Sequence, residues 1–278
     1  MSKLLRANMV RLWKNKMFWL CMGGMLIYAV AYMLYAGHNS FSPITREAYT
    51  LEHYYFQFLL YVGFFFAVVT SMFLGTEYSE DTIRNKLIVG HTRANVYLAN
   101  LIVTFVAALL VMCVWFIGAL VGVPALGFFT LTPADLVGYF LFCVLLAAAY
   151  SAVNTFVAML SSKNIIAVVL VSVAMILCAA VLYDALEAPE KISSLSGVTF
   201  SGTVPMEIVG EEVLNPKYTG GAMRFVFQML MDVLPTGQSV SVAFLKIERP
   251  VTMILSSVIV TVGITALGIK LFCKKDLK

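Results

Sequence analysis

Charge is scarce in this sequence. Of its 278 residues only 12% are Asp, Glu, Lys or Arg, whereas 61% are hydrophobic, and the mean hydropathy is +0.90. Soluble domains usually carry charge on about a quarter of their residues. The composition therefore excludes an ordinary soluble domain and predicts an integral membrane protein that crosses the bilayer several times.

Cysteine and histidine are also few, and their spacing indicates no site. The five cysteines fall within apolar runs or at the end of the last one, so none is placed to staple an outer loop. The three histidines lie singly at the edges of these runs. We predict no disulfide and no metal site. The residues concerned are Cys21, Cys113, Cys143, Cys178, Cys273, His38, His53 and His91.

Ionisable residues are absent from the centres of the apolar runs. Ion-coupled carriers generally place such residues at mid-membrane, so a secondary carrier is a less favoured alternative. A membrane hydrolase would need a nucleophile with a base, and Glu211-Glu212 lies in an outer loop with no histidine nearby. The sequence also has no G-x-x-x-x-G-K-[ST] phosphate loop. We predict that the chain is not an enzyme.

What the sequence does have is six long apolar runs. A helix needs about 20 apolar residues to cross the roughly 30 Å hydrocarbon core. Each run must be helical, because lipid cannot pair the polar groups of an irregular backbone. The fold class is therefore all-α. The predicted spans cover about residues 17–36, 56–74, 96–121, 136–160, 165–183 and 251–272.

Lysine and arginine are distributed unevenly between these runs. If both termini are cytosolic, only six of the 19 fall in the outer segments. This bias favours cytosolic termini, and the net charge of +4 reflects topology rather than nucleic-acid binding. Residues 1–16 alternate apolar and basic side chains at helical spacing, which predicts an amphipathic helix in the inner interface of the bilayer.

The longest outer loop, residues 184–250, changes character along its length. It is polar and rich in Ser, Gly and Pro as far as Gly221. A Met-rich helical stretch follows over 222–234, Pro235-Thr236-Gly237 breaks it, and a mixed apolar stretch continues to Ile247. The pattern predicts either a re-entrant structure in the outer leaflet or an interfacial helix that lies flat.

Polar residues within the spans allow two interpretations. Hydrogen bonding between helices is the favoured one, at about 0.6 kcal/mol for each bond. The alternative is that some of them line a pathway. The candidates for a pathway lining are Thr70, Ser71, Tyr150 and Asn154.

The densest charged stretch, residues 75–93, separates the second and third spans. Three acidic residues precede Arg84 and Lys86, the order that complements a helix dipole. Glu80 and Arg84 are spaced to pair on one helical face, and Gly90 can end the helix in the left-handed conformation. These features predict a short amphipathic helix on the cytosolic side, joined tightly to two spans.

The pattern Glu77-Tyr78-x-x-x-Thr82-Ile83-Arg84, with Gly90-x-x-Arg93 after it, resembles the loop behind the second span of ABC-2 type transporter permeases. That loop often reads E-Y-x-x-G-T-I-R, followed by a small residue and an arginine or lysine. The chain departs from it at Asp81, where the family usually has glycine. The basic start, the six spans and the long outer segment are also similar to that family, so the resemblance implies one transmembrane domain over 1–278.

The resemblance implies a mechanism as well. Such permeases pair as homodimers or heterodimers, each copy binds an ABC ATPase subunit, and the helix between spans two and three couples the two. ATP and Mg²⁺ are then held by the ATPase, and this chain binds no cofactor of its own. Carried onto this sequence, the coupling residues are Glu77, Tyr78, Thr82, Ile83 and Arg84, with Arg93 near the membrane edge.

Small six-span members of that family commonly belong to bacterial systems that export or clear antimicrobial peptides, lipids or drugs. The resemblance thus implies a permease of the bacterial cytoplasmic membrane with an amphipathic cargo. A non-transporting accessory, sensor or immunity subunit is the alternative from another functional class. Cargo-stimulated ATP hydrolysis would separate the two.

Overall fold

The computed structural model describes residues 1–38, 50–161, 165–188, 190–194, 211–215 and 218–275. Within this part of the chain, six helical segments are long and apolar enough to cross a membrane. The all-α class and the six predicted spans are confirmed. The spans are formed by α2 (Lys16–His38), α4 (Leu59–Ser79), α6 (Arg93–Ala119), α8 (Pro133–Leu160), α9 (Ile165–Glu187) and α12 (Pro250–Lys274).

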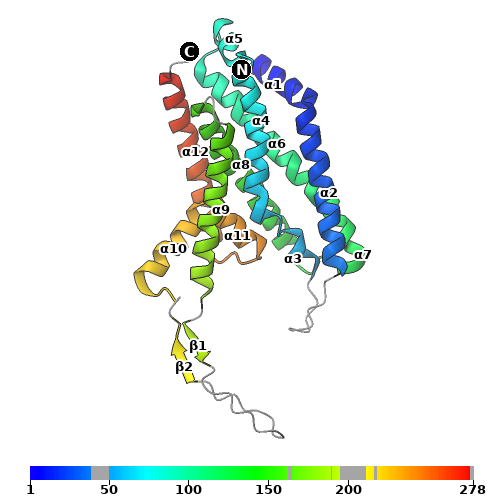
Figure 1. Cartoon of the computed structure of the whole chain (residues 1–278), viewed down its shortest axis with the longest axis vertical. Coiled ribbons are helices and arrows are strands. Elements are labelled where there is room, and N and C mark those ends of the chain that lie inside the picture. The colour runs from blue at the N-terminus through cyan, green and yellow to red at the C-terminus, as the bar shows by residue number, and fades with distance from the viewer. Residues whose placement is uncertain (39–49, 162–164, 189, 195–210, 216–217, 276–278) are drawn as a thin grey trace.

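Shorter elements lie at the two ends of this bundle. At one end are α1 (Ser2–Lys14), α5 (Thr82–Ile88) and the last turn of α12, and we call this the α5 end (Figure 1). The opposite end, which we call the loop end, carries α3 (Leu51–Tyr55), α7 (Val123–Leu126) and the strands (Figure 1). Part of the predicted outer loop falls outside the described residues, and so do residues 162–164 between the predicted spans 136–160 and 165–183.

A two-stranded sheet in the outer loop is an element that the sequence patterns do not predict. β1 (Lys191–Ser194) pairs antiparallel with β2 (Glu211–Leu214), so that Lys191 lies opposite Leu214. Each strand has four residues, and neither Lys-Ile-Ser-Ser nor Glu-Glu-Val-Leu alternates apolar and polar side chains. The sheet extends from the loop end of the bundle (Figure 1).

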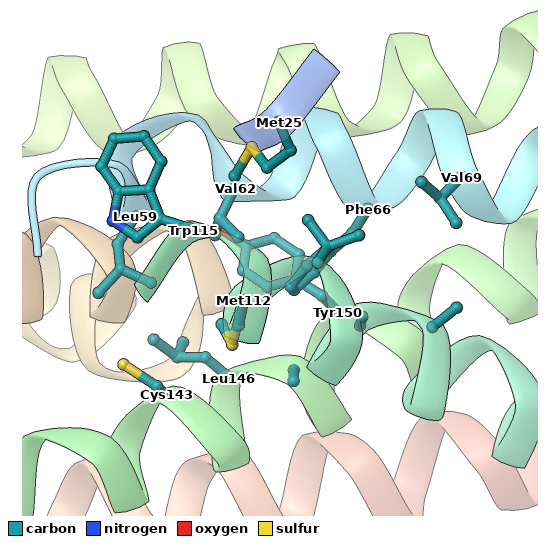
Figure 2. Packing of buried hydrophobic residues seen from close by; sticks show 14 of the residues in the cluster. Met25, Leu59, Val62, Phe66, Val69, Met112, Trp115, Cys143, Leu146 and Tyr150 are labelled. Atoms are coloured by element: carbon teal, nitrogen blue, oxygen red, sulfur yellow. The ribbon is translucent and has the colours of Figure 1, made fainter. Parts of the chain in front are cut away.

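The core lies between α4, α6 and α8, with α2 packed against α6 and α12 against α8. Figure 2 shows side chains from four helices converging there, among them Met25, Phe66, Trp115 and Leu146. The indole of Trp115 is fully buried, stacks on Phe58 at 4.7 Å between ring centroids, and donates to the carbonyl of Tyr55 at 2.9 Å. Much less of α2, α9 and α12 is buried, and these helices present their apolar faces outward.

Two short helices precede the last span. α10 (Gly221–Val233) exposes apolar side chains, whereas α11 (Pro235–Ala243) is buried and packs against α4, α8 and α9. Pro235 begins α11 instead of lying in a gap, because proline is well suited to the first turn of a helix. α11 therefore lies inside the bundle, whereas α10 lies at its surface.

Candidate functional site

The charged stretch after α4 folds differently from the single helix that its charge order predicts. α4 continues through Glu77 to Ser79, and Asp81 then takes a left-handed conformation with φ 51°. α5 begins only at Thr82, so Glu80 and Arg84 do not share one helix and the predicted pairing on one face is wrong. The left-handed residue turns the chain sharply, which lays α5 against the end of α4.

The end of α5 and the start of α6 follow ordinary capping chemistry. Gly90 has φ 97°, and the amide of His91 donates to the carbonyl of Lys86 at 3.1 Å, which ends α5. Thr92 is the N-cap of α6, and its hydroxyl accepts from the amide of Asn95 at 3.3 Å. These two residues make the connection from α5 to α6 short and fixed.

Glu77 is fully buried and lies at the centre of a polar cluster at the α5 end. Arg11 Nη1 donates to Glu77 Oε1 at 2.7 Å, and Lys86 Nζ forms an ion pair with the same oxygen. The other oxygen, Oε2, accepts from Asn100 Nδ2 at 2.7 Å. A buried carboxylate is costly unless it is paired and hydrogen-bonded, and here both of its oxygens are satisfied.

Asn8 completes this cluster. Its Nδ2 donates to Asn100 Oδ1 at 2.7 Å, and its Oδ1 accepts from Lys86 Nζ at 2.8 Å. Burial lowers the pKa of Lys86, while the Glu77 carboxylate opposes that shift. We call Asn8, Arg11, Glu77, Lys86 and Asn100 the Glu77 cluster. It joins α1, α4, α5 and α6 at one point.

Tyr78 and Arg93 connect the same region to the remaining helices. The hydroxyl of Tyr78 donates to the carbonyl of Met159 near the end of α8 at 2.6 Å. Lys275 Nζ donates to that carbonyl at 3.0 Å and lies 5.2 Å from the centroid of the Tyr78 ring. Arg93 Nη1 donates to the carbonyl of Cys273 at 3.0 Å, which caps the end of α12.

The structure thus divides the predicted coupling residues into two groups. Glu77, Tyr78, Thr82, Ile83 and Arg93 bond to or pack against the chain itself: Thr82 Oγ1 donates to the carbonyl of Glu77 at 3.0 Å, and Ile83 is only 2% exposed. Of the predicted set, Arg84 alone is exposed. The outward surface of this segment also includes Asn85, Ile88 at 75% and Val89 at 79% exposure. We call Arg84, Asn85, Ile88 and Val89 the α5 face.

The residues proposed as a pathway lining are all buried within the chain. Ser71 Oγ donates to the carbonyl of Val68 at 2.9 Å, and Asn154 Oδ1 accepts from Ser172 Oγ at 3.2 Å. Tyr150 shares a hydrogen bond of 3.0 Å with Ser239 of α11. Thr70 is 3% exposed. The three bonds have three different partners, and all four side chains are buried within the chain.

Sequence reasoning missed four members of the Glu77 cluster as site residues. Asn8 gave one usable signal, because it lies with Leu4 and Leu12 on the buried stripe of α1, where a polar side chain needs a partner. Arg11 gave none, since a basic residue on an amphipathic helix is expected at the lipid headgroups. Asn100 is one polar residue among several within the spans, and Lys86 contributes to the sequence analysis only through its charge.

Comparison with known families decides the identity. The family model described as ABC-2 family transporter protein matches residues 4–178, from α1 through most of α9. The match covers more than half of the chain and includes the whole Glu77 cluster. The chain belongs to the ABC-2 transporter family. It is thus an ABC-2 type permease, a membrane transport component with several spans. The comparison with curated proteins finds no match.

Membership in the ABC-2 family implies association with an ABC ATPase. The matched region holds the Glu77 cluster and the α5 face, whereas α10, α11 and α12 lie beyond it. The match thus covers the Glu77 cluster and the α5 face, and α10 to α12 have to be interpreted from their own geometry.

Proposed function

We propose that this permease transmits the conformational change of a separate ABC ATPase through α5 to its spans, and that ATP and Mg²⁺ bind only to that partner. The chain itself performs no catalysis. It works in the bacterial cytoplasmic membrane with both termini in the cytosol, as one half of a dimer with a second copy or a homologous permease. Its cargo is amphipathic, in the class of antimicrobial peptides, lipids or drugs.

The observation that carries this proposal is the Glu77 cluster. α5 has only seven residues, too few to hold a position by itself. Through Lys86 and Glu77 it is tied to α1, α4 and α6, and Tyr78 and Arg93 extend the connection to α8 and α12. A force applied to α5 therefore reaches five helices instead of bending a loop.

The α5 face supports docking of a partner at this point. Ile88 and Val89 are among the most exposed aliphatic side chains of the described residues, and Arg84 lies beside them. An apolar centre with a charged neighbour is typical of a protein interface. α4, the helix that carries Glu77, also exposes Tyr61 and Phe64, at 53% and 40%. These aromatic side chains support an amphipathic cargo.

The test uses the permease and its ATPase reconstituted in one membrane. Ile88→Ser with Arg84→Glu should leave the permease folded and reduce ATPase retention at least tenfold, because both side chains point away from the protein. Val10→Ser, an exposed aliphatic residue on α1, is the matched control and should retain the ATPase. Glu77 is unsuitable for this test, since its replacement disturbs the fold.

Two results would contradict the proposal. Normal ATPase retention and cargo export by the Ile88→Ser, Arg84→Glu variant would place the docking surface elsewhere. An ATPase whose activity is the same with and without every candidate cargo, and a membrane across which no cargo moves, would favour the accessory or sensor role instead.

A further inference from the structure

A cavity of about 140 Å³ lies at the loop end, among α9, α10, the link after α11 and the start of α12. Its lining is unlike the apolar core. Three cations and three carboxylates face it, together with two methionines and a tyrosine. The charged residues are Arg224, Lys246, Arg249, Glu187, Asp232 and Glu248.

These charges do not fully satisfy one another. Lys246 pairs with Glu187 at 2.7 Å, but Arg249 Nη1 lies 3.9 Å from Asp232 Oδ2, too far for a hydrogen bond. Arg249 Nη2 donates instead to Gln228 Oε1 at 2.8 Å, which keeps the guanidinium away from the Asp232 carboxylate. Asp232 is only 7% exposed, and its Oδ2 accepts no hydrogen bond from any described residue. The buried Oδ2 of Asp232 therefore lacks a hydrogen-bond donor.

The cavity lacks an acceptor as well. Arg224 Nη2 donates to the carbonyl of Leu186 at 2.9 Å, whereas its Nη1 is buried and finds no acceptor among the described residues. A metal ion does not fit this arrangement, because the described residues contain no group of three His, Cys, Asp or Glu side chains placed to hold one. The missing ligand must supply both a donor and an anionic acceptor.

The position of the cavity indicates where such a ligand comes from. Its walls include the last turn of α9, at Tyr183 and Glu187, and the first turn of α12, at Met253. The apolar spans end at these turns, so the cavity lies at the depth of lipid headgroups. Met231, Met253 and Tyr183 add an apolar wall for the carbon atoms of a ligand.

We propose that this cavity binds a headgroup that carries a primary ammonium and a phosphate, the chemistry of phosphoethanolamine. The ammonium donates to Asp232, and the phosphate accepts from the guanidinium groups of Arg249 and Arg224. The positive end of the headgroup thus lies next to Asp232, and its negative end lies next to Arg249. A choline headgroup has no N–H to donate and leaves Asp232 unsatisfied. This proposal goes beyond transport and does not depend on the ATPase.

Lipid-exchanged, purified full-length permease provides the test. Thermal unfolding and native mass spectrometry are followed after adding phosphatidylethanolamine, phosphatidylcholine, phosphatidylglycerol or soluble phosphoethanolamine. Phosphatidylethanolamine should raise the unfolding temperature and remain bound, at least tenfold more tightly than the other two lipids. A response to soluble phosphoethanolamine as well would support the same site with a soluble source, and a response to the lipid alone would identify the bilayer as the source.

Asp232→Asn and Arg224→Gln should each weaken this binding at least tenfold. Burial raises the pKa of Asp232, although Arg249 opposes the shift, so the folded chain disfavours the charged carboxylate and the neutral Asp232→Asn variant should fold. Asp184→Asn is the matched control, because Asp184 is exposed on α9, one turn from Glu187, and does not line the cavity.

Three outcomes would overturn the proposal. Equal stabilisation by phosphatidylcholine would show that no donor is recognised. An Asp232→Asn variant that binds phosphatidylethanolamine as tightly as the unchanged protein would remove the central contact. No stabilisation by either phosphatidylethanolamine or soluble phosphoethanolamine would assign the cavity to a different ligand.

Discussion

Asp81 has the backbone conformation that glycine prefers. With φ 51° it is one of two described non-glycine residues with positive φ, and it lies at the turn between α4 and α5. An L-residue in this conformation loses roughly 1–2 kcal/mol relative to the right-handed region, although Asp and Asn tolerate it best. This cost explains why the resembling family motif has glycine at this position: glycine adopts the left-handed conformation without a steric penalty.

Replacing Asp81 tests this reason directly. Asp81→Gly should leave stability unchanged or raise it by about 0.5 kcal/mol, and Asp81→Ala should lower it by about 1 kcal/mol, because alanine meets the steric penalty without the polar group of aspartate. Thermal unfolding of the purified variants measures both. If the alanine variant is as stable as the glycine variant, the left-handed conformation at Asp81 is wrong.

Glu77 is the only carboxylate among the bonds of the Glu77 cluster, which makes it the most sensitive residue of the α5 end. Glu77→Gln leaves the cations of Arg11 and Lys86 without a counter-charge, at side-chain exposures of only 24% and 15%. Removing one partner from a buried ion pair costs about 3–5 kcal/mol. We expect a large fall in the unfolding temperature, with α5 and α1 released first in hydrogen exchange.

A double variant separates charge from shape at this site. Glu77→Gln with Lys86→Met removes one unpaired cation together with the carboxylate, so part of the lost stability should return. The comparison isolates the coupling between the two residues. Equal stability of the single and double variants would mean that Lys86 is not paired with Glu77 in the folded protein.

The sequence alone identifies the charged stretch 75–93 but not the long-range contacts that its buried residues make. The motif from Glu77 to Arg93 and the stop at Gly90 are local patterns, and local patterns can be found by inspection. The bonds from Asn8 and Arg11 cross 92 and 66 residues of sequence, and no periodicity reports such a contact. The family resemblance implies that Glu77 is a coupling residue, but its burial depends on contacts with α1, which the motif does not encode.

At the scale of elements, the start of α11 lies directly against the backbone of α10. A Cβ placed on Gly237 would lie 2.7 Å from the Cα of Met231 and closer still to its carbonyl oxygen, nearer than real Cβ atoms approach. The obstacle is backbone, so it cannot rotate away. Gly237→Ala should therefore displace α11 and destabilise the protein by about 1–3 kcal/mol or more. Gly263→Ala on α12, where a Cβ meets nothing within 4 Å, is the control.

Displacement of α11 has a second readout. Gln238 Nε2 donates to the carbonyl of Met253 at 3.2 Å and to that of Asp232 at 2.6 Å, so α11 holds α10 and α12 together beside the cavity. The Gly237→Ala variant should lose binding of phosphoethanolamine along with stability. A variant that is destabilised yet binds normally would show that α11 does not shape the cavity.

The spans can be predicted because length and hydropathy determine them. The breaks between helices within an apolar segment cannot be predicted in this way. The apolar segment Leu51–Ser79 is divided into α3 and α4 by residues 56–58, and Phe56 and Phe58 are fully or nearly fully buried there. An aromatic residue has the same hydropathy in a helix and in a turn. Burial of α11 between α4, α8 and α9 was equally invisible, because it depends on the shape of its neighbours.

At the scale of the whole molecule, the two ends of the bundle have different chemistry. The α5 end carries the Glu77 cluster and caps α8 and α12 with cations, whereas the loop end carries the cavity and the two-stranded sheet (Figure 1). A cation at a helix C-terminus is stabilising, so Lys275 and Arg93 help to fix which ends of α8 and α12 meet α5. The uneven Lys and Arg content then predicts that this end is cytosolic.

Cysteine labelling tests that orientation. With the five native cysteines replaced, Asn85→Cys on the α5 face and Glu190→Cys at the loop end present one exposed thiol each. In intact cells an impermeant maleimide should label only the Glu190→Cys variant, and Asn85→Cys should react only after the membrane is opened. Both positions lie outside the six spans, so lipid shields neither. The reverse pattern would place α5 outside the cell, where no ATPase could reach it, and the proposed coupling would fail with it.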